Sequence, residues 1–223
     1  MVAVVLDDGI DSRTCKPGKR VVGHIAQEVP LGKRAIRVRS KIFGEVTRVE
    51  NGPGLAKLGL RFDRIEVDNE QLAISAKARA AASPVLAANA GNPTVYASAP
   101  GAGTMALIGD DVVYGVGGPV QDQMGKVVGK SVRGGVLVNI DNRRGSMCEG
   151  MPLSDKPQPA WVFSATACGV YGLGNLQLAN ESDENADEIL FSRRNKHEEQ
   201  PTNLKLPSGT ALLLAIAGAP DRQ

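Results

Sequence analysis

Apolar and polar residues alternate from residue 36 onward, and this alternation restricts the chain to β structure more strongly than any other feature. Over residues 36–47 the apolar side chains fall on even positions, and the odd positions are mostly polar. A period of two places the two sets on opposite faces of a strand, so one face is predicted to be core and the other solvated. The apolar set consists of Ile36, Val38, Ile42 and Val46.

A turn and a second strand are predicted next. Residues 51–54, Asn-Gly-Pro-Gly, are typical of a turn, because glycine accepts positive φ and proline donates no hydrogen bond. Apolar residues then occupy even positions from Leu58 to Phe62 but odd positions from Ile65. A change of phase within one strand requires one extra residue, so we predict a β-bulge near residues 63–64. Leu60 and Val67 are therefore both expected to be buried despite their opposite parity.

A third strand completes a meander. Asp68-Asn69 is predicted to form a two-residue hairpin turn, since both residue types tolerate left-handed φ, and alternation resumes over residues 72–79. Two further strands are predicted at 2–6 and 21–29. About five strands in the first part of the chain are enough for a small barrel or one half of a sandwich.

The rest of the chain is also predicted to be rich in strands. The 26 glycines and 13 prolines separate short apolar runs, which favours turns and strands over long helices. A weak helical tendency at 78–83 is expected to end at Pro84. Residues 210–217 are apolar on both faces, as in a strand inside a sheet. Further strands are expected at 105–108, 111–116, 126–132, 135–140, 160–167, 169–173 and 175–179, with residues 189–191 as a short strand or helical turn.

These elements predict a mainly β fold, a small antiparallel barrel or sandwich with a long β-rich, loop-rich extension. Residues 1–83 are expected to form a meander or barrel-like domain, and the Ala-, Gly- and Pro-rich residues 84–104 a linker or loop. Residues 105–223 form a second β-rich region, in which 206–217 are candidates to return to the first sheet. Basic residues are in excess over 1–83 and acidic residues over 84–223, which agrees with a division near residue 83.

Charge and hydropathy restrict the partners and the location. A net charge of +2 is too small by itself to indicate nucleic acid or an anionic membrane. No apolar run approaches the ~20 residues of a membrane-spanning helix, so no integral membrane segment is expected. The first residues lack the features of a signal peptide, which indicates the cytoplasm if Met1 is the true start. An export signal upstream of Met1 would instead indicate the periplasm or cell envelope.

Four segments carry a resemblance to known proteins: VPL at 29–31, SKIFGEV at 40–46, LGLRFDRIEV at 58–67 and LPSGTALLL at 206–214. They resemble the β domains of uncharacterised exported bacterial proteins and are distantly similar to the TrbI-like scaffold subunits of type IV secretion channels. The likeness covers roughly residues 5–82 and the last strand. In that pattern a Pro-x-Gly-Ser turn precedes the Gly-x-Val strand, whereas this chain has residues 36–39 in place of the Pro and Gly. The resemblance implies an envelope location and brings no catalytic residue.

Three cysteines cannot all pair within one chain. If the protein is exported, Cys148 and Cys168 can form a bridge, which loop-closure arithmetic makes worth ~3 kcal/mol. In a reducing compartment the same two residues would be small apolar core groups, and the residues alone leave both readings open. Cys15 would then be the remaining thiol.

Motifs for catalysis, metals and cofactors are absent from the sequence or incomplete. His24 and His197 both lie among polar residues and are expected at the surface. No serine lies in a GxSxG motif, and the glycine-rich residues 101–118 lack the lysine of a phosphate-binding loop. Two acidic groups, Asp7, Asp8 and Asp11, and Asp183, Glu184, Asp187 and Glu188, do not follow a calcium-loop spacing. We therefore expect no catalytic or metal-binding residue and no cofactor.

One basic run, residues 33–41, could contact an anionic partner. Its members Arg37, Arg39 and Lys41 are the candidate binding residues, because a small barrel is a common host for single-stranded nucleic acid. Residues 1–83 contain only Phe43 and Phe62 as aromatic residues on which bases could stack, so a nucleic-acid partner is not favoured. A charged face that protects an exposed strand explains the run more economically.

The sequence therefore predicts a non-enzymatic structural or interaction protein of a bacterial cell envelope, with an unidentified protein partner there. The envelope location depends on the resemblance. A hydrolase with carboxylates gathered from distant strands is one alternative, because such residues need not be close in sequence. A barrel that binds single-stranded nucleic acid through residues 33–41 is the other.

Overall fold

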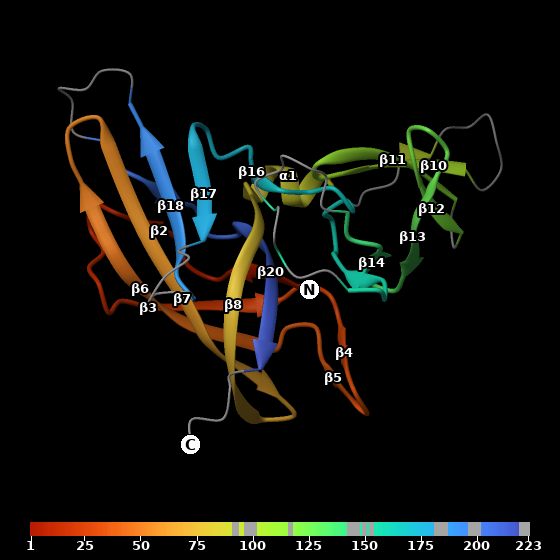
Figure 1. Ribbon diagram of the computed structural model, residues 1–223, viewed down its shortest axis with the longest axis horizontal. Coiled ribbons are helices and arrows are strands. Elements are labelled where there is room, and N and C mark those ends of the chain that lie inside the picture. The colour runs from red at the N-terminus through yellow and green to blue at the C-terminus, as the bar shows by residue number, and fades with distance from the viewer. Residues whose placement is uncertain are drawn as a thin grey trace.

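The structure is a computed structural model that describes residues 1–90, 94–95, 102–115, 118–141, 148, 151, 154–180, 187–195 and 202–218. Its central feature is a closed antiparallel barrel of six strands in the order β8-β20-β1-β3-β6-β7, with β7 pairing back onto β8. A second sheet lies beside the wall formed by β8 and β20 (Figure 1). The barrel strands are β1 (Val2–Leu6), β3 (Arg20–Ile25), β6 (Lys41–Asn51), β7 (Leu55–Val67), β8 (Glu70–Ala82) and β20 (Ala211–Gly218).

Three more strands extend the barrel sheet where β7 and β8 separate. These two strands pair only near their connecting turn, and β18 (Ile189–Arg194) takes the neighbouring place along the first half of β7. The next strand is β17 (Leu176–Asn180), while β16 (Gly169–Tyr171) pairs in parallel with the end of β8. The Asn180 amide accepts from Ala78 N at 2.8 Å and donates to Ala78 O at 3.0 Å. This side chain therefore supplies the strand-like hydrogen bonds that link β17 to β8.

The second sheet is a meander in chain order, so each strand pairs with its neighbour in sequence. It is an insertion into the barrel sheet, because the chain leaves that sheet after β8 and returns to it with β16. Its strands are β9 (Thr94–Val95), β10 (Ala102–Leu107), β11 (Asp110–Gly115), β12 (Pro119–Asp122), β13 (Val127–Val132), β14 (Gly135–Val138) and β15 (Gln158–Pro159). Smaller elements are the pair β2 (Ile10–Asp11) and β19 (Lys205–Leu206), the hairpin β4 (Val29–Leu31) and β5 (Arg34–Ile36), and helix α1 (Pro84–Asn89).

The wall between the two sheets is apolar on both faces. Leu212 and Leu214 of β20 belong to the barrel core, whereas Leu213 packs with the second sheet and Phe163. In β8 the small side chains of Ala80 and Ala82 also face the second core. Strand β20 lies between β8 and β1, so the expectation of an interior strand at 210–217 is confirmed. Of residues 206–217, those from Ala211 onward lie in the barrel sheet as β20, whereas Leu206 pairs with Ile10 in a separate two-stranded sheet.

The β-bulge predicted from the change of parity is present in β7. Phe43 lies opposite Arg64 and Gly44 opposite Phe62, which leaves Asp63 as the extra residue. Leu60 and Val67 are both 0% exposed, as expected. The hairpin turn that follows is also confirmed, since Asp68 and Asn69 have φ values of 50° and 67°.

The strand predicted from residue 36 is wrong in its first part. Strand β5 ends at Ile36 and β6 begins at Lys41, with a turn between them. Arg39, at φ 71°, has a left-handed backbone and donates its N–H to Ile25 O at 2.8 Å, so the chain changes direction there. Val38, predicted to be core, is consequently 48% exposed.

Other boundaries also differ from the sequence prediction. The helix follows Pro84 rather than preceding it, because proline at the first turn loses no helical hydrogen bond and the Ser83 side chain accepts from Leu86 N. Part of 84–104 is thus regular structure: α1, β9 and the start of β10. Residues 160–167 form turns with one bridge, Ile108 to Phe163, instead of a strand. Within residues 105–223, strands β16, β17, β18 and β20 belong to the barrel sheet, whereas β11 to β15 belong to the second sheet.

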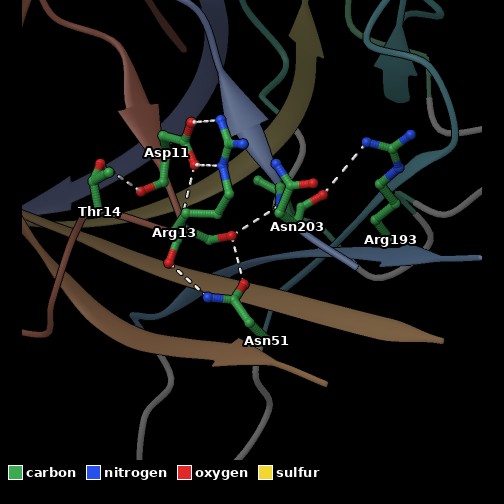
Figure 2. A network of polar contacts seen from close by, with 8 residues as sticks. Asp11, Arg13, Thr14, Asn51, Arg193 and Asn203 are labelled. Atoms are coloured by element: carbon green, nitrogen blue, oxygen red, sulfur yellow. Dashed lines mark hydrogen bonds and ion pairs between the residues drawn. The ribbon is translucent and has the colours of Figure 1, made fainter. Parts of the chain in front are cut away.

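A polar network joins distant segments at one end of the barrel (Figure 2). The Ser12 hydroxyl donates to Asn51 Oδ1 at 2.6 Å and accepts from Leu204 N at 2.9 Å. Beside it, the Arg13 guanidinium donates to both carboxylate oxygens of Asp11, at 3.1 and 2.8 Å. These hydrogen bonds lower the pKa of Asp11 to about 2.

The bulged strand gives a stability prediction. Phe62 is 0% exposed, so Phe62→Ala should lower the free energy of unfolding by ~3–5 kcal/mol through lost burial and a cavity. Phe43→Ala is the control, because Phe43 is only half-buried. Denaturant unfolding measures both variants. Equal losses in the two variants would contradict the placement of Phe62 in the core.

The Asp11–Arg13 pair gives a pH prediction. The pKa of Asp11 is lower in the folded than in the unfolded state. Its contribution to the free energy of unfolding is therefore fully present above the unfolded pKa of ~4 and is lost as pH falls towards 2. Arg13 is well exposed, so solvent and salt screen the pair and its contribution to the free energy of unfolding should be small. The stability difference between wild type and Asp11→Asn should narrow over this range in unfolding experiments. A difference that is constant down to pH ~2 would contradict the assignment.

Candidate functional site

A disulfide joins the connection between β14 and β15 to the residues just before β16. Cys148 and Cys168 are bonded, with their Cα atoms 5.9 Å apart, which confirms the pairing that the sequence left open. The bridge lies just before β16, where the Tyr171 hydroxyl accepts from Cys168 N at 2.9 Å and donates to Cys168 O at 3.0 Å. Cys148 Sγ lies 3.4 Å from Arg79 O in β8. The bridge therefore sits directly against the barrel wall.

Arg79 is the buried charge at this junction. Ala78 lies opposite Leu214 and Ala80 opposite Leu213, so Arg79 is the extra residue of a second bulge. Its side chain is fully buried and donates through Nη2 to Asp141 O at 2.8 Å and Ala165 O at 3.3 Å. Burial lowers the pKa of the guanidinium, an effect that Tyr171 and Asp141 oppose. The bulge thus lets the Arg79 guanidinium reach from the barrel to the inserted region, where it donates hydrogen bonds to backbone carbonyls.

Gln27, in the segment between β3 and β4, makes a similar connection. This buried side chain donates to Val136 O of β14 at 2.9 Å and accepts from the backbone N–H of Trp161. Gly135 is required there, because a Cβ at that position would lie 2.5 Å from Gln27 Oε1. Arg79 and Gln27 together fix the orientation of the second sheet against the barrel.

A hollow of about 460 Å³ lies beside this junction. Asp141 and Ala165, whose carbonyls accept from Arg79, contribute to its lining. Its polar lining includes Asp122, Lys126, Asn139, Asp141, Ser164 and Thr166. Two aspartates of the second-sheet region, one at the end of β12 and one just after β14, thus line one hollow, and the hydrolase alternative needs such a pair of carboxylates. However, Asp122 Oδ1 already accepts from Met124 N and Lys126 N, at 3.0 and 2.9 Å, so it shapes the turn. The hydrolase alternative stays a prediction.

The predicted binding residues lie on a separate projection, which we call the basic arm: residues 31–41, from the tip of hairpin β4–β5 through the turn before β6. Figure 1 shows this hairpin extending away from the barrel. Arg37 is 78% exposed, and its Nη2 is 3.8 Å from Asp68 Oδ1. Arg39 lies in the turn and Lys41 begins β6, both exposed. The three are brought together on one projection, although not on one face of a strand.

The remaining candidate residues have structural contacts or lie outside the described residues. His24 Nδ1 is 2.5 Å from Asp7 Oδ1, on the surface. Asp187 accepts from Ser75, and the buried Glu188 pairs with Arg48 at 3.0 Å. His197, Asp183 and Glu184 lie outside the described residues. Within the described part of the chain, no group of three His, Cys, Asp or Glu residues could hold a metal, and no helix is long and apolar enough to cross a membrane.

Sequence reasoning missed Arg79 and Gln27. The available signal for Arg79 was a single charge inside the small-residue run Ala78–Ala82, which a solvated strand face does not explain. Gln27 offered no comparable signal, because a glutamine between Ala26 and Glu28 is ordinary at a surface.

Comparison with known proteins adds no relative: no protein-family model, no curated protein and no solved structure matches the chain.

The junction gives a prediction on Arg79. Arg79→Met should lower the free energy of unfolding by about 1–3 kcal/mol, because Asp141 O loses the hydrogen bond from Arg79 Nη2, whereas Ala165 O keeps the one from Asp141 N at 2.9 Å. The control is Lys77→Met on the same strand, where the side chain is only half-buried. Denaturant unfolding followed by the fluorescence of Trp161, the single tryptophan, reports directly on the junction. Equal losses of unfolding free energy in the two variants would show that Arg79 does not stabilise the junction.

Proposed function

We propose that this chain is a non-enzymatic structural or interaction protein of a bacterial cell envelope. The observation that carries the proposal is the Cys148–Cys168 bridge, which joins the connection between β14 and β15 to the residues just before β16 and lies against the barrel wall. Disulfides persist in oxidising compartments and are rare in the cytosol. The resemblance of residues 5–82 and the last strand to exported bacterial proteins supports the same location.

The contacts of the buried polar side chains support a structural or interaction role. The side chains of Arg79 and Gln27 form hydrogen bonds with backbone carbonyl and N–H groups at the junction. Glu188 is buried against Arg48 and Thr47. These contacts stabilise a platform of two sheets in one orientation, from which the basic arm projects. A rigid platform with an exposed arm suits a protein whose task is contact with a partner.

The thiol state of the protein tests this proposal. In protein taken from its native compartment and denatured without reductant, we expect one titratable thiol per chain, Cys15, and three after reduction. In the folded protein Cys15 should react slowly, because it is buried and burial raises the pKa of its thiol. Titration with a thiol reagent before and after reduction measures each number.

Three thiols in denatured, never-reduced protein would contradict the bridge. That result would return the protein to a reducing compartment, with Cys148 and Cys168 as ordinary core residues.

A further inference from the structure

We propose that the basic arm, residues 31–41, is a docking site for an acidic segment of another protein that also carries aliphatic side chains. This inference rests on the interaction role proposed above, and it names the surface and the chemistry of the partner. The arm combines exposed apolar side chains, unneutralised positive charge and a fixed backbone.

The hairpin is anchored at its base and exposed at its tip. Val29 and Ile36 lie opposite each other and are 9% and 1% exposed. Two residues further along β4, Leu31 is 42% exposed, and Val38 in the following turn is 48% exposed. Large aliphatic side chains therefore reach solvent on a projection whose base is packed in the core. Such groups gain free energy when a partner removes them from water.

The positive charge of the arm is only partly neutralised. Arg34 pairs with Glu70 at 3.0 Å and lies 3.7 Å from Asp68, which is also the acidic neighbour of Arg37. By contrast Lys33, Arg39 and Lys41 are exposed and make no ion pair with any residue that the structure describes. A partner with negative charge would complement these three groups and be steered towards them.

The arm is held in place before any partner binds. The Arg34 ion pairs tie the hairpin to the β7–β8 turn. At the other end, Arg39 N donates to Ile25 O at 2.8 Å and Ile25 N donates to Ser40 O at 2.9 Å. A fixed backbone lowers the entropy lost on binding.

The same observations favour a protein over other anionic partners. Single-stranded nucleic acid binds through base stacking on aromatic side chains, and residues 31–41 contain none. A membrane surface contributes about 1 kcal/mol per basic residue, so a few charges with two aliphatic side chains give only weak, reversible attachment. An acidic segment with aliphatic side chains satisfies both the charges and the exposed Leu31 and Val38.

The test measures binding of the full chain to a fluorescent peptide of alternating Glu and Leu, at low salt and at physiological salt. The charge variant is Lys33→Ser, Arg39→Asn and Lys41→Ser, with Asn at 39 because it tolerates the left-handed backbone. The apolar variant is Leu31→Ser with Val38→Ser. The matched control removes three exposed charges elsewhere, by Lys16→Ser, Lys19→Ser and Arg20→Ser. Circular dichroism confirms that each variant is folded.

We expect both arm variants to weaken peptide binding by about tenfold or more, while the control variant stays within about threefold of wild type. Physiological salt should weaken wild-type binding and should affect the charge variant less. No binding of the peptide by wild type at up to about 1 mM would overturn the proposal. Equal weakening by the control variant would also overturn it, since that result indicates general electrostatic attraction.

Three further probes separate the rival occupants: a single-stranded oligonucleotide, vesicles with anionic lipid, and the protein alone in sedimentation. If the oligonucleotide or the vesicles bind the arm more tightly than the peptide does, the proposal of a protein partner is wrong, and nucleic acid or membrane is the occupant. Arm-dependent self-association would make a second copy the occupant. None of these results depends on the thiol state. The binding experiments therefore test the docking site, and the thiol titration tests the envelope location, independently of each other.

Discussion

The two-faced wall of β8 and β20 is the constraint on which the rest of the structure depends. A strand in a barrel normally has one face in the core and one in solvent, but here both faces are covered, one by the barrel core and one by the second sheet. Small side chains make this possible, because Ala80 and Ala82 let the second layer approach while Leu213 and Phe163 fill the space. The second sheet therefore packs on a barrel wall that it cannot leave without exposing apolar area.

Bulges place buried polar groups both at the junction of the two layers and within the barrel sheet. Arg79 reaches the inserted region because it is an extra residue in β8, between Ala78 and Ala80. In β6 the register shift between Val46 and Arg48 makes Thr47 the extra residue, and its hydroxyl donates to the buried carboxylate of Glu188. Burial of such groups is costly unless they are hydrogen-bonded, so each one favours a single arrangement of its neighbours.

The sequence predicted what depends on local periodicity and missed what depends on contacts between distant segments. The change of parity after Phe62 located the bulge at Asp63, and the apolar run at 210–217 predicted an interior strand, because both are local consequences of side-chain alternation. Periodicity could not show that Arg39 turns the chain between β5 and β6. It also could not show that residues 160–167 serve as turns beneath Arg79. The basic residues of the candidate arm were identified as a run in the sequence, whereas the exposure of Leu31 and Val38 beside them required the structure.

Native-state hydrogen exchange tests most directly whether the shared wall makes the barrel and the second sheet one cooperative unit. Leu213→Ala alters only the outward face of β20, where Leu213 is 0% exposed and packs with the second core. If the wall couples the two layers, amides of β14 and of the barrel strand β1 should lose protection by the same amount, about 2–5 kcal/mol. Loss of protection in β14 with β1 unchanged would contradict the account and show that the second sheet opens independently.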